Sequence, residues 1–255
     1  MVREYRSLFI TDELQKAYEA KAAGRYVVLA LPLSDNASYD MEDFPYAIEN
    51  LDEIPDTYLD RLILRFAGKP WTILETARCR LREITVEDVD ALYEIYADPS
   101  VTAYMENLYA DPEEERAYTR DYIKNHYGFF EFGMWIIEDR QTGRIIGRAG
   151  LDMVAEKENP QLGFVVRKEY QRKGYAFEVC RAILAYAHEE LGFPVVEASC
   201  DADNVASINI LCKLGFLRDE KGVEFGNTTK NEQKVCVFWH EQKRASEADK
   251  CYTIV

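Results

Sequence analysis

Apolar residues in the first third of the chain follow two periods, one typical of helices and one of strands. Residues 12–23 carry apolar side chains at helical spacing and end before a glycine, which predicts an amphipathic helix. The run at 25–33 is almost continuously apolar and predicts a buried strand. After a polar loop, a short strand is predicted at 46–50 and a helix at 55–66. This order of elements predicts a small α/β domain over residues 1–71.

A second region begins near residue 76 and has its own alternation of strands and helices. Residues 78–85 alternate, with Cys79 and Leu81 on one face and arginines on the other, which predicts a strand. A threonine then caps one helix, and a second helix, predicted over residues 112–128, starts at a proline followed by three glutamates. Two strands follow, at 133–140 and 144–154, joined by a short polar turn.

The stretch QRKGYA, residues 171–176, joins a predicted strand, QLGFVV, to a long predicted helix. A helix N-terminus presents unpaired N–H groups and about half a positive charge. Gly174 can adopt backbone angles that other residues avoid, so that successive amides form an anion-binding nest. Arg172 and Lys173 add positive potential, which favours a pyrophosphate site. The alternative for this hexapeptide alone is a polar loop whose glycine only allows the chain to turn.

A second motif downstream decides between these two interpretations. The segment VVEASCDADN predicts a strand, and NVASINILCKLGF predicts a short helix that ends at a glycine. Gln171-x-x-Gly174-x-Ala176 matches the Q/R-x-x-G-x-G/A signature of the GNAT superfamily of N-acetyltransferases. Asn204-x-x-Ser207, followed by KLGF, resembles that superfamily's other cofactor segment. The chain most resembles the ribosomal-protein N-terminal acetyltransferase group, over residues 76–243.

The resemblance implies an α/β (α+β) fold with a mixed central sheet of six or seven strands flanked by four helices. The small α/β segment 1–71 then precedes the GNAT domain as an accessory domain of unknown role, and residues 244–255 form a C-terminal tail. Acetyl-CoA is the implied co-substrate, held in a cleft where two central parallel strands diverge. The implied cofactor contacts are Phe164, Val165 and Val166 with the pantetheine arm, Gln171, Arg172, Lys173, Gly174, Tyr175 and Ala176 with the pyrophosphate, Asn204 with the pantetheine, and Ser207 near the thioester.

The implied chemistry is direct attack of an amine on the thioester within a ternary complex, and here the chain departs from the superfamily's better-defined members. Gln161 stands where relatives often have a glutamate, Ser199 replaces another glutamate, and Leu211 replaces a frequent acid tyrosine. Glu197 and Asp201 share the face of Ser199, so each is a candidate base acting through water. Solvated carboxylates without a catalytic role are the alternative, with proximity of the reactants supplying the rate.

The sequence therefore predicts an acetyl-CoA-dependent N-acetyltransferase for a primary amine, either a small molecule or a protein N-terminus. The alternative is a catalytically weak or inactive acetyl-CoA-binding regulatory module. The acceptor pocket is expected from the aromatic-rich segment 104–135, in which Glu106 is a candidate partner for an ammonium group. Aromatic side chains at helical spacing are equally typical of a core.

The composition of the chain restricts the kinds of partner that it is expected to bind. The net charge of −15 argues against nucleic-acid binding and is compatible with a cationic amine substrate. No run approaches the roughly 20 apolar residues of a membrane helix, and the N-terminus lacks the pattern of a signal peptide, so a cytoplasmic protein is predicted. Six cysteines without metal-site spacing and three scattered histidines predict no metal site. A homodimer is left open.

Overall fold

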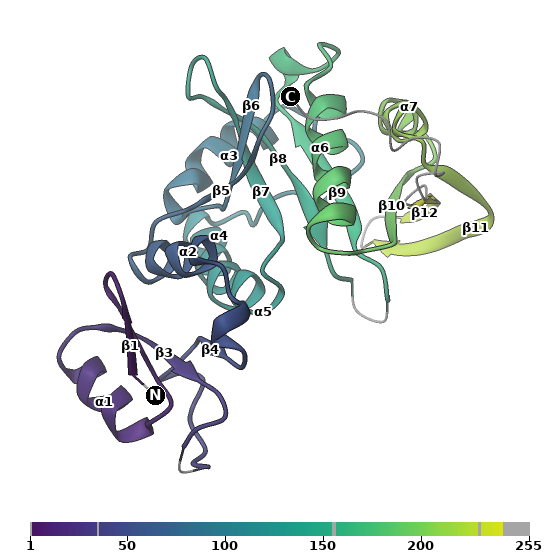
Figure 1. Cartoon of the computed structure of the whole chain (residues 1–255). Coiled ribbons are helices and arrows are strands. Elements are labelled where there is room, and N and C mark those ends of the chain that lie inside the picture. Colours follow the sequence, from purple (N-terminus) through teal and green to yellow (C-terminus); the bar gives the residue numbers. More distant parts are fainter. Residues whose placement is uncertain (1, 35, 155–156, 229–230, 242–255) are drawn as a thin grey trace. The chain divides into compact units, whose positions relative to one another are not determined.

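The computed structural model describes residues 2–34, 36–154, 157–228 and 231–241, and the chain forms two compact units (Figure 1). The first unit comprises Met1–Trp71 together with Tyr122–Glu131, and the second begins at Thr72 and contains the rest of the chain. The predicted tail at 244–255 lies outside the described residues.

The first unit is built on a four-stranded sheet in the order β1-β2-β3-β4. β1 (Val2–Tyr5) pairs antiparallel with β2 (Leu8–Thr11), whereas β3 (Tyr26–Ala30) and β4 (Ala47–Ile48) continue the sheet in parallel. The sequence did not predict the hairpin of β1 and β2. These two strands are only four residues long, so their alternation is too brief to recognise.

Helices pack against the sheet of this unit and form two hydrophobic cores with it. α1 (Leu14–Ala22) packs with Val27 and Leu29 of β3, while Val28 and Ala30 belong to a second core with α2 (Asp56–Phe66). A 3-10 turn at Leu51–Glu53 precedes α2. Because β3 is covered on both faces, its sequence reads as a continuous apolar run rather than an alternation.

The segment at 122–131 extends the first unit, although the sequence predicted one continuous helix over 112–128. The helix α4 (Pro112–Asp121) ends early, and a π-helix follows over Tyr122–Tyr127, then α5 (Gly128–Phe130). The wider π turn brings the Tyr122 ring against both His126 and Tyr127, at centroid distances of 4.5 and 5.2 Å. Glu131, in the left-handed region at φ 62°, then accepts hydrogen bonds from Arg65 and Tyr58 at 2.9 and 3.3 Å.

The second unit contains an eight-stranded mixed sheet in the order β11-β12-β10-β9-β8-β7-β6-β5 within the described residues. The strands are β5 (Thr72–Glu75), β6 (Cys79–Arg82), β7 (Met134–Asp139), β8 (Ile145–Asp152), β9 (Gln161–Val166), β10 (Val195–Asp201), β11 (Leu217–Thr228) and β12 (Asn231–Glu241). The predicted α/β class is confirmed. The sheet has more strands than the expected six or seven, and β5, an edge strand outside the predicted domain, is one reason.

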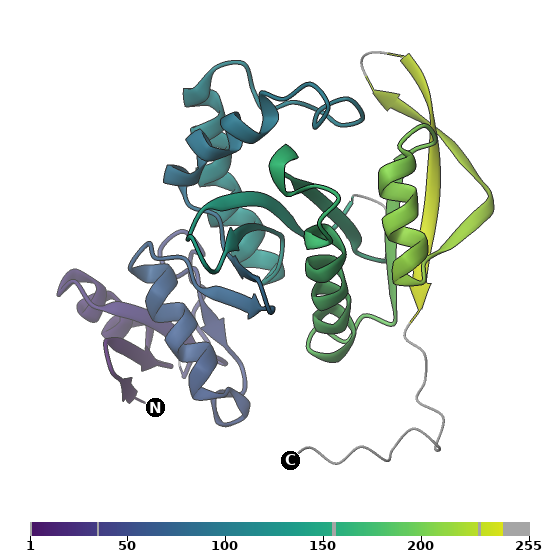
Figure 2. The same cartoon turned by 90° about the horizontal axis from the view of Figure 1, so that it is seen from above.

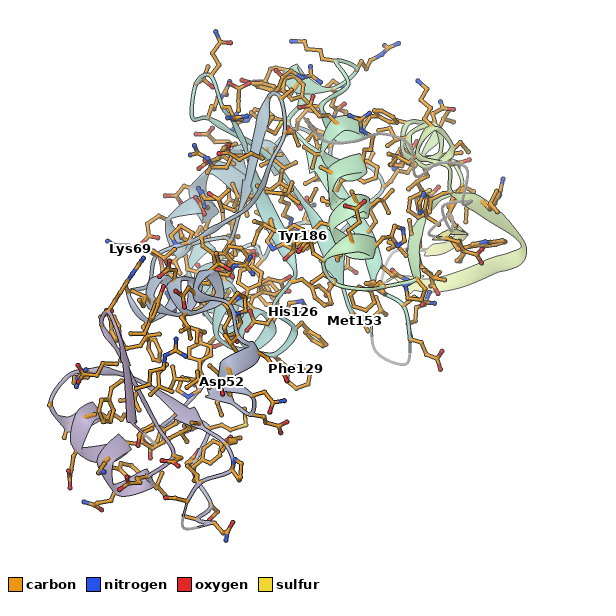
Figure 3. All side chains as sticks on the ribbon, in the orientation of Figure 1. Asp52, Lys69, His126, Phe129, Met153 and Tyr186 are labelled. Carbon is orange, nitrogen blue, oxygen red and sulfur yellow. The ribbon has the colours of Figure 1, made fainter. Side chains whose placement is uncertain are left out.

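Helices cover both faces of this sheet (Figure 1). α6 (Tyr175–Glu189) packs on the face of Trp135, and its Tyr186 extends toward the sheet to meet that ring edge to face, with centroids 5.7 Å apart (Figure 3). α3 (Val89–Tyr96) lies over the opposite face, where Arg148 of β8 reaches Tyr96. Alternate residues of a strand point to opposite faces, so neighbouring residues of β7 and β8 serve both layers.

The predicted start of the second domain's first helix is confirmed. The Thr85 amide donates a hydrogen bond of 2.7 Å to Asp88, in a capping box that opens a 3-10 turn at Val86–Asp88. α7 (Val205–Leu214) ends at Gly215, also as predicted. Among the described residues, no helix is both long and apolar enough to cross a membrane.

Candidate functional site

The central feature of the second unit is a gap between two parallel strands. β9 and β10 are neighbours in the sheet but are paired only at Gln161 and Glu197, next to a hydrogen bond from the Glu197 amide to the Pro160 carbonyl of 2.9 Å. Beyond that point the strands diverge, and a cavity of about 1320 Å³ opens between them. Residues 162–166 of β9 and 198–200 of β10 line it. Figure 2 shows the two helices that follow these strands, α6 and α7, side by side.

The loop before α6 lines this cavity and has backbone N–H groups without backbone acceptors. After a 3-10 turn at Lys168–Tyr170, Arg172 and Gly174 both adopt positive φ, 59° and 83°. Among the described residues, the amides of 172–174 donate no hydrogen bond to a backbone carbonyl. The first amides of α6 are also free of intrahelical partners, as at any helix N-terminus. The loop therefore forms the kind of nest that binds a phosphate group.

Arg78 holds this loop in place, which the sequence did not predict. Its Nη1 donates to the Lys173 carbonyl at 3.0 Å, its Nε pairs with Glu178 at 2.6 Å, and its guanidinium lies 4.1 Å from the centroid of the Tyr175 ring. Burial works against ionisation of Glu178, but hydrogen bonds from Thr76 and Arg78 hold the pKa of Glu178 below its usual value. The one acidic side chain in the first turn of α6 is therefore neutralised by an arginine. No sequence signal connects residue 78 to a loop 95 positions away.

The N-terminus of α7 contributes the other wall. Asn204 is its N-cap, and its Oδ1 accepts a hydrogen bond of 3.1 Å from the Ser207 amide. This leaves the Asn204 amide nitrogen able to donate to a ligand. Leu211, in the next turn, lines the cavity as well but is 1% exposed and has no polar atom to offer.

The predicted cofactor residues converge on this cavity. All of them except Lys173 line it, namely Phe164, Val165, Val166, Gln171, Arg172, Gly174, Tyr175, Ala176, Asn204 and Ser207. Lys173 contributes the carbonyl that Arg78 holds. Contact of these residues with a cofactor stays a prediction.

The two predicted catalytic carboxylates lie elsewhere. Neither Glu197 nor Asp201 is among the residues that line the cavity. Glu197 accepts hydrogen bonds from Lys157 and Asn159, both at 3.1 Å. Asp201 caps a turn, in which its Oδ1 accepts a hydrogen bond of 2.7 Å from the Asp203 amide. Both carboxylates thus already have hydrogen-bond partners within the protein.

The opposite side of the cavity is formed by α3, the loop after it and the central strands. Tyr96, Tyr104, Met105, Met134 and Arg148 line this side. The expectation that segment 104–135 contributes to the site holds only for its two ends, and Glu106 is exposed and does not line the cavity. Among the described residues, the charged side chains of the lining are all cationic: Arg148, Arg172 and Lys213.

Comparisons with known proteins match this architecture. Residues 78–217 match the acetyltransferase (GNAT) domain family. The uncharacterized N-acetyltransferase YoaA of Bacillus subtilis (strain 168) is 31% identical over 153 residues, which are 58% of this chain and 84% of YoaA.

Two solved structures share the fold. The ribosomal L7/L12 α-N-protein acetyltransferase RimL, in complex with coenzyme A, is similar with a TM-score of 0.58 and 14% identity over 67% of this chain and 98% of RimL. A spermidine N-acetyltransferase chimera that includes the Vibrio cholerae protein SpeG has a TM-score of 0.55 and 18% identity, over 65% of this chain and 96% of the chimera. At these identities the likeness extends to the fold alone.

Proposed function

The chain belongs to the acetyltransferase (GNAT) domain family, and on that premise we propose that it transfers the acetyl group of acetyl-CoA to a primary amine. The observation that carries the proposal is the gap between β9 and β10, with the amide nest of the α6 N-terminus at its rim. The acceptor is a small molecule or a protein N-terminus. Structures with the same fold include enzymes named for each kind of acceptor.

The residues at the gap fit acetyl-CoA. A diphosphate needs several amide donors and positive potential, which the loop at 172–174, the α6 dipole and Arg172 offer together. The pantetheine arm would extend along the edge of β9, whose backbone is not paired with β10 beyond Gln161. The Asn204 amide nitrogen would donate to that arm from the opposite wall, since Asn204 lines the cavity there.

Acetyl-CoA supplies a thioester carbonyl carbon, to which the amine nitrogen bonds as the carbon–sulfur bond breaks, with one proton leaving the nitrogen and one reaching the thiolate. A backbone N–H of β9 would stabilise the oxyanion that develops at the carbonyl. The cavity walls hold the amine beside the carbonyl, which by itself accounts for a large part of the rate.

Proton transfer is assigned to water rather than to a side chain. No Asp, Glu or His is among the described residues that line the cavity. Since Glu197 and Asp201 are held by partners outside it, neither is proposed as a direct base. We expect slow acetyl transfer at a rate that depends strongly on the pKa of the acceptor amine, because only the uncharged amine attacks the thioester.

The same lack of a base favours the second candidate, an acetyl-CoA-binding regulatory module with little or no turnover. Both candidates require coenzyme A binding, so the deciding experiment measures thiol release from acetyl-CoA across a broad panel of primary amines and peptide N-termini. Release that depends on an amine supports the transferase. Micromolar binding of coenzyme A with no amine-dependent release supports the regulatory module.

A further inference from the structure

Two neighbouring polar side chains in one wall of the cavity, Tyr96 and Arg148, have hydrogen-bonding atoms without a well-formed partner among the described residues. Tyr96 of α3 is 6% exposed, and its hydroxyl makes no well-formed hydrogen bond within the described part of the chain, although it lies close enough to the Arg148 side chain for that contact to lower the pKa of the phenol. Arg148 of β8 has a buried Nε that is likewise without an acceptor there. Buried polar atoms in native proteins are nearly always paired, so these two atoms in one cavity wall are available to a ligand.

Strand register places Arg148 on the same face of the sheet as the β9 residues beside which the thioester is proposed. Arg148 is directly opposite Val165 of β9 and therefore on the same face of the sheet. Gly163, two residues earlier in β9, is also on that face, and the Met134 side chain packs against it, since a Cβ at Gly163 would lie 3.3 Å from the Met134 sulfur. A ligand in the part of the cavity that Gly163, Met134 and Arg148 line would lie between the β9 edge, where the thioester is proposed, and the Arg148 guanidinium.

The guanidinium also has no carboxylate partner. Among the described residues, Arg148 forms no ion pair. Glu115 and Asp152 are near enough that their charges, like that of Arg148, affect the pKa of Tyr118. Its guanidinium lies over the Tyr96 ring, 5.2 Å from the centroid. Burial raises the pKa of the Tyr96 phenol, with Arg148 opposing the rise, so the phenol stays protonated and can donate. Other cavity-lining cations, Arg172 and Lys213, belong to the loop before α6 and to α7.

From this arrangement we infer that the acceptor amine carries a carboxylate, which Arg148 binds and to which Tyr96 donates a second hydrogen bond. The inference rests on the proposed acetyl transfer and specifies its substrate class: a small amino acid-like molecule with an apolar body. Tyr104, Met105 and Met134 would contact that body. A guanidinium matches a carboxylate in charge and in geometry. A polyamine would meet a cation and no carboxylate in this cavity.

Matched acceptors test the inference. The panel pairs phenylalanine with phenylalaninamide and methionine with methioninamide, and adds spermidine and a tripeptide with a free N-terminus. Amidation lowers the pKa of the α-amine, which alone favours the amide at neutral pH. A higher kcat/KM for the acid, by about 10- to 100-fold, would therefore report recognition of the carboxylate.

Variants connect that preference to Arg148. In Arg148→Met the ratio of kcat/KM for acid to that for amide should fall to 1 or below, because the lower amine pKa alone favours the amide. Arg148→Lys should keep part of the preference for the acid, and Tyr96→Phe should lower it by a few fold. Affinity for coenzyme A should not change. Arg80→Met is the matched control, since Arg80 is a half-exposed strand arginine outside the cavity, and it should keep the wild-type ratio.

Equal rates for acid and amide, or a ratio that survives Arg148→Met, would overturn the inference. So would preferred turnover of spermidine or of the tripeptide. Calorimetry of the same acids with the coenzyme A complex gives a readout without turnover. Arg148-dependent binding without any acetylation would support the inference while refuting the transferase, and neither binding nor acetylation of the acids would refute the inference.

Discussion

A glycine-to-glutamate change at the start of α6 tests the anion nest. Gly174 is at φ 83°, and a Cβ added there would lie 3.5 Å from Arg78 Nη2, an ordinary van der Waals distance. Space therefore exists for a side chain, and the strain comes from the left-handed backbone, about 1–2 kcal/mol. That cost is small against the usual stability of a folded domain, about 5–15 kcal/mol. Gly174→Glu should fold.

Gly174→Glu should weaken coenzyme A binding far more than it destabilises the fold. The new carboxylate would enter the space that the nest offers to a diphosphate. Losing two charge-assisted hydrogen bonds, at about 1.5–3 kcal/mol each, removes about 3–6 kcal/mol of affinity. This corresponds to a rise in Kd of about 10²- to 10⁴-fold, before repulsion between like charges is added. Gly174→Ala, which introduces the strain without the charge, should lose about tenfold or less.

Calorimetry with coenzyme A and with pantetheine separates the diphosphate from the rest of the ligand. Gly174→Glu should lose coenzyme A affinity and keep that for pantetheine. Gly192→Glu is the matched control, because Gly192 follows the other end of the same helix at φ 73°, in open space and outside the cavity. A Gly174→Glu protein that binds coenzyme A within threefold of wild type, or an equal loss in Gly192→Glu, would refute the reasoning.

Substitutions at three further positions test the residues that support the site. Arg78→Met removes the hydrogen bond to the Lys173 carbonyl, so the Kd for coenzyme A should rise about tenfold, and an unchanged Kd would show that the loop holds itself. Asn204→Asp keeps an oxygen for the Ser207 amide, so urea unfolding should change little, but loss of the amide donor should weaken coenzyme A binding; Asn204→Ala should also lose about 1 kcal/mol of stability. Glu178 has a lowered pKa when folded, because hydrogen bonds from Thr76 and Arg78 outweigh its burial, so its stabilising effect is present above its unfolded pKa near 4.3 and is lost as the pH falls. Between about pH 5 and pH 3, Glu178→Gln should therefore show a shallower fall in unfolding free energy than wild type, and parallel curves would contradict this.

The local parts of the site could be read from the sequence. Gly174, the helix after it and the N-cap Asn204 are specified by neighbouring residues, since backbone angles, helix dipoles and caps act over a few positions. The strand QLGFVV was likewise predictable because its apolar run is bounded by turn residues.

Contacts between segments that are far apart in the sequence could not be predicted in this way. Arg148 and Tyr96 are 52 positions apart and meet only through the packing of α3 on β8. The same holds for Arg78 with the loop at 172–174, and for Lys157, whose ion pair with Glu197 removes that carboxylate from the candidate bases. The π-helix at 122–127 was missed because its residues also fit an α-helical period, and ring packing rather than propensity selects the wider turn.

A structure of the protein with coenzyme A tests the central claim most directly. The account predicts the diphosphate within hydrogen-bonding distance of the amides at 172–176, with the pantetheine between β9 and β10 and its sulfur toward Gly163. A diphosphate bound away from the α6 N-terminus, or a pantetheine outside the gap between the two strands, would contradict it.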